Sequence, residues 1–215
     1  MSGTLIDWIL HLDTHLATLA SGHGVLVYGI LFAMIFIETG VVVMPFLPGD
    51  SLLFVCGALA AKGILAWQLV VPLLIVAAIA GDALNYALGD MMRKKAIEAR
   101  RIPFIKTAHV ERTQAFFDRH GRKTIILARF VPVVRTLAPF VAALGSMPYP
   151  VFLRYNAIGA VLWVAGLAGA GFALGNVAWV SANLTPVLLG LIGLSMLPGL
   201  IAWMRERQRT RTGPL

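Results

Sequence analysis

The sequence predicts an all-α integral membrane protein, and three observations support that fold class. Hydrophobic residues make up 59% of the 215 residues and charged residues only 13%, whereas soluble domains carry about 25% charged residues. No lysine or arginine precedes Lys62, and Arg154 is the only charged residue between Thr136 and Met204. Apolar stretches of this length are typical of segments that cross a membrane.

The positions of the basic residues predict which segments face the cytoplasm. The chain has a net charge of +8, and of its 18 lysines and arginines ten lie in residues 93–123 and four in residues 205–211. Both clusters flank apolar segments, as basic loops do on the cytoplasmic side of a membrane. We therefore expect a multi-pass protein of the cell inner (cytoplasmic) membrane, with residues 91–123 and the tail 205–215 in the cytoplasm. Nucleic acid is not an expected partner.

The first elements are a surface helix and a broken pair of apolar helices. Residues 1–22 predict an amphipathic helix at the membrane surface, because their leucines and isoleucines recur at helical spacing. Residues 25–61 are apolar on both sides of a break that contains Pro45, Pro48 and Gly49. Each arm is shorter than the roughly 20 residues that a crossing needs. This segment therefore predicts a re-entrant hairpin that enters and leaves the membrane on one side.

The later elements repeat this order. We predict a transmembrane helix at residues 64–89, followed by a basic cytoplasmic segment at 91–123. A second re-entrant hairpin follows at 124–147, and two further transmembrane helices at 151–176 and 186–204. The second hairpin is broken around Pro132 and Pro139, because proline interrupts the hydrogen bonding of a helix.

Charge placement predicts how the hairpins are oriented. If both basic segments are cytoplasmic, the number of crossings between them is even. The last two spans supply two crossings, so the second hairpin supplies none and enters from the cytoplasmic face. The span 64–89 ends in the cytoplasm and therefore starts outside, so the first hairpin enters from the outer face. The prediction is an inverted repeat of a re-entrant hairpin plus a transmembrane helix, with amphipathic surface helices and one extra C-terminal span. Transporters often have such repeats, with the substrate site where the broken helices meet.

Four charged residues flank the two breaks, namely Glu38 and Asp50 at the first and Arg129 and Arg135 at the second. A charge near the bilayer centre costs about 2.5–3.5 kcal/mol, so we expect all four to face one shared interior and not lipid. Two arginines there would bind a phosphate or carboxylate, and two carboxylates would carry protons or gate the path. The alternative is that the four residues form ion pairs that only hold the hairpins together.

Other polar and aromatic residues give weaker signals. Asp82, near the end of the span 64–89, is a secondary candidate for a proton site, with helix capping or snorkelling as the alternative. Four tryptophans are predicted to anchor the protein at the membrane interface without a chemical role: Trp67, Trp163, Trp179 and Trp203.

Enzyme chemistry is not predicted. All five histidines lie outside the full spans and outside both breaks, and no G-x-S-x-G segment is present. The single cysteine, Cys56, has no Cys/His spacing of a metal site around it. We therefore expect no catalytic residue, no metal and no cofactor.

Several motifs recur in an order and spacing that point to a known family. They are Glu38…Pro45…Pro48-Gly49-Asp50, Gly81-Asp82…Tyr86…Gly89, Arg129-Phe130-Val131-Pro132…Arg135…Pro139 and Met147…Phe152…Tyr155-Asn156…Gly159…Trp163. Taken together, over about residues 25–175, they resemble the DedA family, also called SNARE-associated or VTT-domain proteins.

The resemblance implies a function as well as a fold. It implies a half-transporter with two facing re-entrant hairpins that flips undecaprenyl phosphate, a polyprenyl-phosphate lipid carrier, back across the membrane, with protons as the coupling ion. The family's functional residues fall on Glu38, Asp50, Arg129 and Arg135. A proton-coupled exporter of small cations or drugs is the first alternative, and a structural protein of membrane homeostasis is the second. Whether the chain forms a homo-oligomer is left open.

Overall fold

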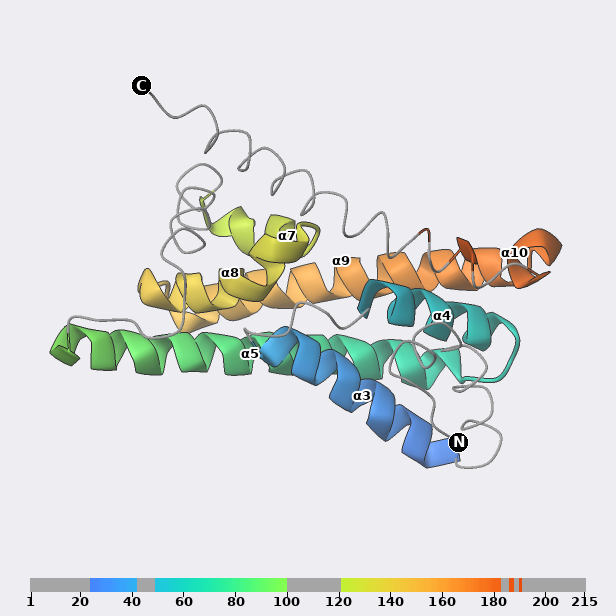
Figure 1. Ribbon diagram of the computed structural model, residues 1–215, viewed down its shortest axis with the longest axis horizontal. Coiled ribbons are helices and arrows are strands. Elements are labelled where there is room, and N and C mark those ends of the chain that lie inside the picture. Colours follow the sequence, from blue (N-terminus) through green and yellow to red (C-terminus); the bar gives the residue numbers. More distant parts are fainter. Residues whose placement is uncertain (1–23, 42–48, 100–120, 183–185, 188–189, 191–215) are drawn as a thin grey trace, which may run out of the picture.

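Two long helices run side by side and form the frame of the molecule (Figure 1). The computed structural model describes residues 24–41, 49–99, 121–182, 186–187 and 190, and every regular element in these ranges is helical. The long helices are α5 (Trp67–Ala99) and α9 (Tyr149–Gly175), and the shorter helices pack on them. The predicted all-helical class is therefore confirmed for the described part of the chain.

Both long helices have the length and composition to cross a membrane. The apolar stretches Trp67–Lys94 and Tyr149–Gly175 contain 28 and 27 residues. At about 1.5 Å per residue, each exceeds the roughly 30 Å hydrocarbon core of a bilayer. Helix α9 lies within two residues of the predicted span 151–176.

Helix α5 is longer than the predicted span 64–89. It continues to Ala99, so the helix runs past the predicted end of the span at residue 89 and into the segment 91–123. Asp90 forms ion pairs with Arg93 at 2.7 Å and Lys94 at 2.8 Å, three and four residues further along the helix. Pairs at these spacings stabilise a helix, which explains why the polar sequence stays helical.

The first broken segment consists of α3 (Gly24–Gly40) and α4 (Gly49–Ala61). Helix α3 packs mainly against α5 and α4 mainly against α9, so the two arms diverge (Figure 1). Gly49 is the first residue of α4, whereas Pro45 and Pro48 lie outside the described residues. That these arms form a re-entrant hairpin, and that the repeat is inverted, stay predictions.

The second broken segment contains a 3₁₀ turn η1 (Gly121–Lys123), α7 (Thr124–Ala128) and α8 (Pro132–Leu144). Pro132 begins α8 after Val131, whose backbone is extended, as suits a residue that precedes proline. Pro139 lies inside α8, so the prediction that it breaks a helix is wrong. An interior proline costs about 3 kcal/mol. The buried residues Ala138 and Phe140 beside it show that tertiary packing of α8 on the molecule offsets this cost.

Several predicted elements lie wholly or largely outside the described residues. They are the surface helix 1–22, most of the cytoplasmic segment 91–123, nearly all of the span 186–204 and the tail 205–215. Of the region after α9, the structure describes α10 (Ala178–Ala182) and a few residues beyond it, among them Val187, which packs against Ala58 and Val180.

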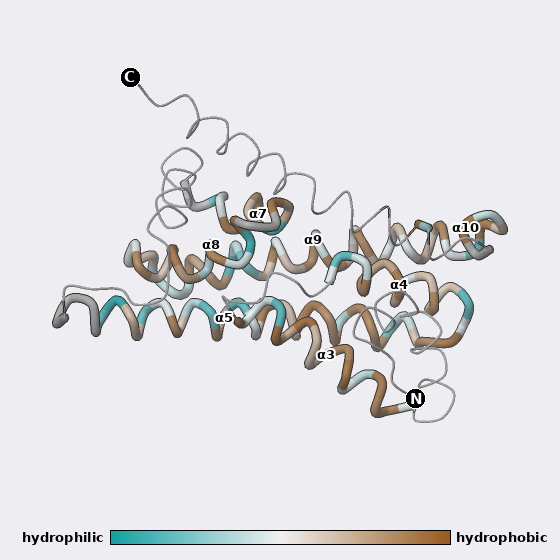
Figure 2. The backbone as a smooth tube through the Cα atoms, in the orientation of Figure 1, coloured by the Kyte–Doolittle hydropathy of each residue, from teal (hydrophilic) through white to brown (hydrophobic). Residues whose placement is uncertain are grey.

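Glycines allow α4 and α9 to touch through their backbones. A Cβ atom on Gly57 would lie 1.9 Å from the carbonyl oxygen of Ala168, and one on Gly171 would lie 2.0 Å from that of Phe54. Close approach through small residues is how helices associate in membranes, where water does not drive them together. Figure 2 shows apolar residues along most of α3 and α4, and shows the hydrophilic residues of α5 mainly in its C-terminal half.

Replacing one of these contact glycines should separate the two helices. Gly171→Ala is expected to lower the free energy of unfolding by about 1–3 kcal/mol, because the new methyl group overlaps backbone atoms of α4. Gly166→Ala on the same helix is the matched control, since its methyl group meets nothing within 4 Å and alanine favours a helix. Thermal unfolding of both purified variants in detergent measures the difference; equal stability would contradict the packing described.

Candidate functional site

Arg135 joins the two broken segments through a pair of short ion contacts. Its Nη1 donates to Asp50 Oδ1 at 2.8 Å and its Nη2 to Glu38 Oε1 at 2.7 Å. The three side chains are 11%, 22% and 3% exposed, so the contacts are largely shielded. Helices α8, α4 and α3 supply one residue each, and one guanidinium group therefore serves two carboxylates.

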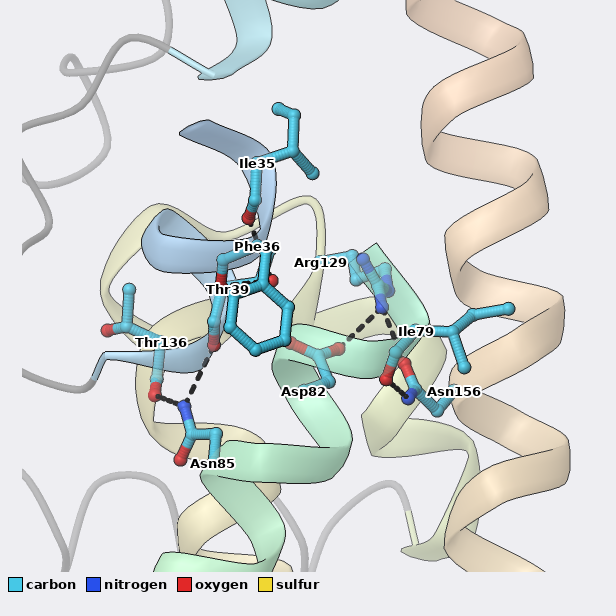
Figure 3. Close-up of polar contacts among 9 residues, drawn as sticks. All are labelled: Ile35, Phe36, Thr39, Ile79, Asp82, Asn85, Arg129, Thr136 and Asn156. Carbon is cyan, nitrogen blue, oxygen red and sulfur yellow. Dashed lines mark hydrogen bonds and ion pairs between the residues drawn. The ribbon is translucent and has the colours of Figure 1, made fainter. Parts of the chain in front are cut away.

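Arg129 forms a second, deeper cluster with residues of the two long helices. Its Nη2 donates to Asp82 Oδ2 on α5 and to Asn156 Oδ1 on α9, both at 2.5 Å (Figure 3). Asn156 in turn donates from Nδ2 to the carbonyl oxygen of Ile79 at 3.1 Å. The side chains of Arg129 and Asp82 are only 2% and 5% exposed. This ion pair lies in the interior, where each charge depends on its partner.

Asp82 is therefore a central residue of the site and not a peripheral one. The sequence interpretation placed it near the end of a span that stopped at residue 89, but α5 continues to Ala99 and puts Asp82 midway along the helix. Its partner Arg129 excludes the capping and snorkelling alternatives, because the carboxylate points to a buried guanidinium. The difference arises because the partner of Asp82 lies 47 residues away in the chain, where local sequence patterns do not indicate it.

Trp163 contacts both clusters, and its predicted role as an interfacial anchor is wrong. Its indole Nε1 donates to Asp50 Oδ1 at 2.9 Å, and its ring centroid lies 5.0 Å from Cζ of Arg135 and 5.7 Å from Cζ of Arg129. The residue is 2% exposed. The contacts fall within the range of cation–π interactions. Trp163 thus contacts Asp50 and both arginines, and the ion pairs of the arginines connect it to Glu38 and Asp82.

Two residues that were not predicted as site residues also belong to the site. Asn156 and Trp163 lie seven residues apart on α9, with Gly159 on the same face. Residues seven apart lie on the same side of a helix, so this spacing was a sequence signal that could have identified Asn156 and Trp163 as site residues. All three are buried.

Glycines make room for the charged side chains. A Cβ atom on Gly159 would lie 3.1 Å from Cδ and 3.2 Å from Nε of Arg129. A Cβ atom on Gly49 would lie 1.9 Å from Oε2 of Glu38, so any side chain at position 49 would displace the carboxylate. Gly49, which was predicted only as a helix break, thus also positions a site residue.

Asn85 links the C-terminal end of α3 to α8 across α5. Its Nδ2 donates to the carbonyl oxygens of Thr39 at 3.1 Å and Thr136 at 2.9 Å (Figure 3). These two carbonyls lie next in the chain to Glu38 and Arg135. The amide therefore fixes the backbones that carry one of the ion pairs.

The site is not balanced in charge or in hydrogen bonding. Two guanidinium groups face three carboxylates, so the fully ionised cluster carries an excess negative charge. At the same time Nε and Nη1 of Arg129 are buried and have no hydrogen-bond partner among the described residues. Leaving a buried donor unpaired costs about 1–3 kcal/mol, and more on a charged group, so such atoms in a structure call for an explanation.

Metal binding is not indicated by the described residues. They contain no group of three His, Cys, Asp or Glu side chains placed to hold a metal ion. The donors and acceptors present are guanidinium, carboxylate, amide and indole groups, which suit the binding of a charged solute and the transfer of protons.

Comparison with known proteins identifies the class. The VTT domain matches residues 47–173, a range that contains Asp50, Asp82, both arginines and Trp163. The chain is 48% identical to Protein DedA of Escherichia coli over 95% of its own length and 94% of that protein. This chain therefore belongs to the DedA family of VTT-domain membrane proteins, and the resemblance seen in its motifs is confirmed.

Further relatives are also named as membrane proteins. The chain is 42% identical to an uncharacterized membrane protein of Mycobacterium leprae, over 83% of this chain and 81% of that one. It is 33% identical to the inner membrane protein YghB of Escherichia coli, over 82% and 81%. No solved structure showed a significant match. The predicted membrane location is thereby confirmed in its general form.

The buried pair of Arg129 and Asp82 should respond very differently to single and double changes. Arg129→Ala is expected to destabilise the protein by about 3–5 kcal/mol, because Asp82 is left buried without its partner. The double variant Arg129→Met with Asp82→Leu should recover most of that loss, since it removes both charges. Unfolding in detergent with increasing denaturant measures the three proteins.

Arg93→Ala is the control for this comparison. Arg93 and its partner Asp90 are 30% and 28% exposed, and ion pairs near the surface contribute about 0–1 kcal/mol. If Arg129→Ala were no more destabilising than Arg93→Ala, Arg129 and Asp82 would not form a buried pair.

Proposed function

We propose that this protein is a membrane transporter that returns an anionic polyprenyl-phosphate lipid carrier, of the undecaprenyl phosphate type, across the cell inner membrane with the uptake of protons. The observation that carries the proposal is the state of Arg129. This permanent cation is buried, holds Asp82 with one nitrogen, and has two further nitrogens, Nε and Nη1, without a protein partner among the described residues. A phosphate group offers such donors strong, charged acceptors.

The size of the protein fits the handling of a lipid better than that of a whole soluble solute. Only the phosphate head group needs a polar path, while the isoprenoid chain stays among the lipid tails. The long helices expose many apolar side chains for such contact, including Ile158, Val161 and Leu162 on α9, close in sequence to Asn156 and Trp163. Return of the carrier toward the cytoplasm follows the direction that family membership suggests.

Charge balance supports coupling to protons. A cluster that already has an excess negative charge would repel a phosphate at short range, in surroundings where such repulsion is poorly screened. Arg135 neutralises only one of the two carboxylates that contact it, so Glu38 or Asp50 is the natural place for a proton. Protonating one of them leaves Arg135 with one ion pair and removes the excess negative charge of the site. Proton uptake would then precede or accompany the entry of the anion.

The same inventory of groups supports binding and proton transfer without covalent chemistry or a cofactor. In this proposal the basic segment 91–123 and the C-terminal tail lie in the cytoplasm. The partners are the polyprenyl-phosphate lipid and protons. Arg129 and Arg135 serve the phosphate, Glu38 and Asp50 the protons, and Asp82 holds Arg129 in place.

Transport of the lipid in vesicles tests the assignment of the arginines. Arg129→Ala and Arg135→Ala should each slow the movement of undecaprenyl phosphate between leaflets by about 10- to 100-fold, because a hydrogen bond to a charged group contributes about 1.5–3 kcal/mol. Arg154→Ala is the control, since Arg154 is an exposed residue at the start of α9. Full transport by both variants of the site would refute the proposal.

The pH dependence tests the assignment of the acids. Wild-type transport should rise as the pH on the loading side falls, because protonation removes the excess negative charge before the anion enters. Glu38→Gln and Asp50→Asn mimic the protonated side chains, so each variant should load phosphate lipid at high pH and lose its response to a proton gradient. Transport rates at several pH values, with and without a gradient, measure both effects.

Two other results would favour different functions. A proton flux that depends on a small cation or drug, persists without Arg129 and Arg135, and vanishes without Glu38 and Asp50 would favour an exporter. Rescue of a deletion strain by a variant in which all four residues are neutral would favour a structural role in membrane homeostasis.

A further inference from the structure

Trp163 is the side chain that touches both charged clusters. Its N–H group and Nη1 of Arg135 donate to the same oxygen, Oδ1 of Asp50, at 2.9 and 2.8 Å. The faces of its ring and of the two guanidinium groups are close, with centroid distances of 5.0 Å to Arg135 and 5.7 Å to Arg129. A change in the hydrogen bonding of Asp50 can therefore alter the position of the Trp163 indole and, with it, the contact of that ring with Arg129.

The position of Trp163 on α9 strengthens this link. Asn156, which binds Arg129, and Gly159, which packs against its Cδ and Nε, lie on the same face of α9. One helix thus presents to the two arginines a hydrogen-bond acceptor, a glycine that allows close packing, and an aromatic ring. A rotation or shift of α9 would change all three contacts together.

We propose that Trp163 is a positioning residue that couples proton uptake by the pair of Glu38 and Asp50 to phosphate binding at Arg129. The inference rests on the proposed function, and it assigns different tasks to the two arginines. Arg135 is held by Glu38 and Asp50 and serves the phosphate only after one of them is protonated. Arg129 has two nitrogens, Nε and Nη1, without a hydrogen-bond partner among the described residues, and these receive the phosphate.

The coupling follows from the shared acceptor. When the pair of Glu38 and Asp50 gains a proton, Arg135 is left with one ionised carboxylate in place of two. Its contact with Oδ1 of Asp50 then changes, and with it the hydrogen bond that Trp163 donates to the same oxygen. The charged groups around this event are Glu38 on α3 and Arg135 on α8, with Arg129 and Asp82 next to them. An indole freed from Asp50 changes its contact with Arg129, and the site becomes open to the anion only in the protonated state.

Transport of undecaprenyl phosphate in vesicles tests this coupling with two substitutions. Trp163→Phe keeps an aromatic face but lacks the N–H group, so it should lower transport about tenfold and flatten its pH dependence. Trp163→Leu also loses the ring and should lower transport further. Trp179→Phe, at an exposed tryptophan of α10, is the matched control and should retain the wild-type rate and pH profile.

A fluorescence measurement tests the same inference without transport. In full-length protein in lipid nanodiscs, tryptophans 8, 67, 179 and 203 are changed to phenylalanine, so that Trp163 is the only tryptophan and can be excited selectively over the four tyrosines. Its emission should shift as the pH is varied, and Asp50→Asn should abolish that shift. Inorganic phosphate should also change the emission at low pH, and Arg129→Gln should remove this response.

The results separate this inference from the proposed function. If the wild-type protein does not move undecaprenyl phosphate, the proposed function fails, while the fluorescence titration still decides the coupling. If emission from Trp163 does not vary with pH, or if Trp163→Phe transports with the wild-type pH profile, the coupling role is refuted. Should Trp163→Leu fail to fold, the single-tryptophan protein, which keeps the native residue, gives the answer.

Discussion

The contact of Arg135 with two carboxylates is the interaction on which the arrangement of the broken segments depends. Helices α3 and α4 pack mainly against different long helices, and their carboxylates meet at a guanidinium that α8 supplies. A charge in apolar surroundings is stable only beside its counter-charge, so each of these three residues fixes the position of the other two. The ends of α3, α4 and α8 are thereby held at one point of the molecule.

The two arginines differ in a way that a purely structural network would not require. A buried polar network that only stiffens a protein has its donors and acceptors satisfied. Among the described residues, the Arg135 cluster has more carboxylates than cations, and two nitrogens of Arg129 have no hydrogen-bond partner. An unbalanced cluster of this kind changes its free energy when a proton or an anion arrives, and this property supports a binding function over cohesion alone.

Backbone packing explains how an apolar chain keeps such a cluster inside. Gly57 and Gly171 bring α4 onto α9, and Gly49 and Gly159 leave room for Glu38 and Arg129. Membership of the DedA family and the membrane location are consistent with this design, because helices in lipid associate through close contact between small residues. The apolar faces that remain outside are available to lipid, so the charged groups need no exposure to it.

The sequence by itself determined the helical membrane class, the family and the four charged residues at the breaks. It also placed three of the four ends of the long helices to within three residues. These features follow from composition, apolar run length and local motifs, which are properties of neighbouring residues. The tertiary structure decided that Arg129 pairs with Asp82, that Trp163 is buried beside both arginines, and that α8 continues through Pro139. Such outcomes depend on contacts between helices that lie far apart in the chain, where burial and counter-charges override local preferences.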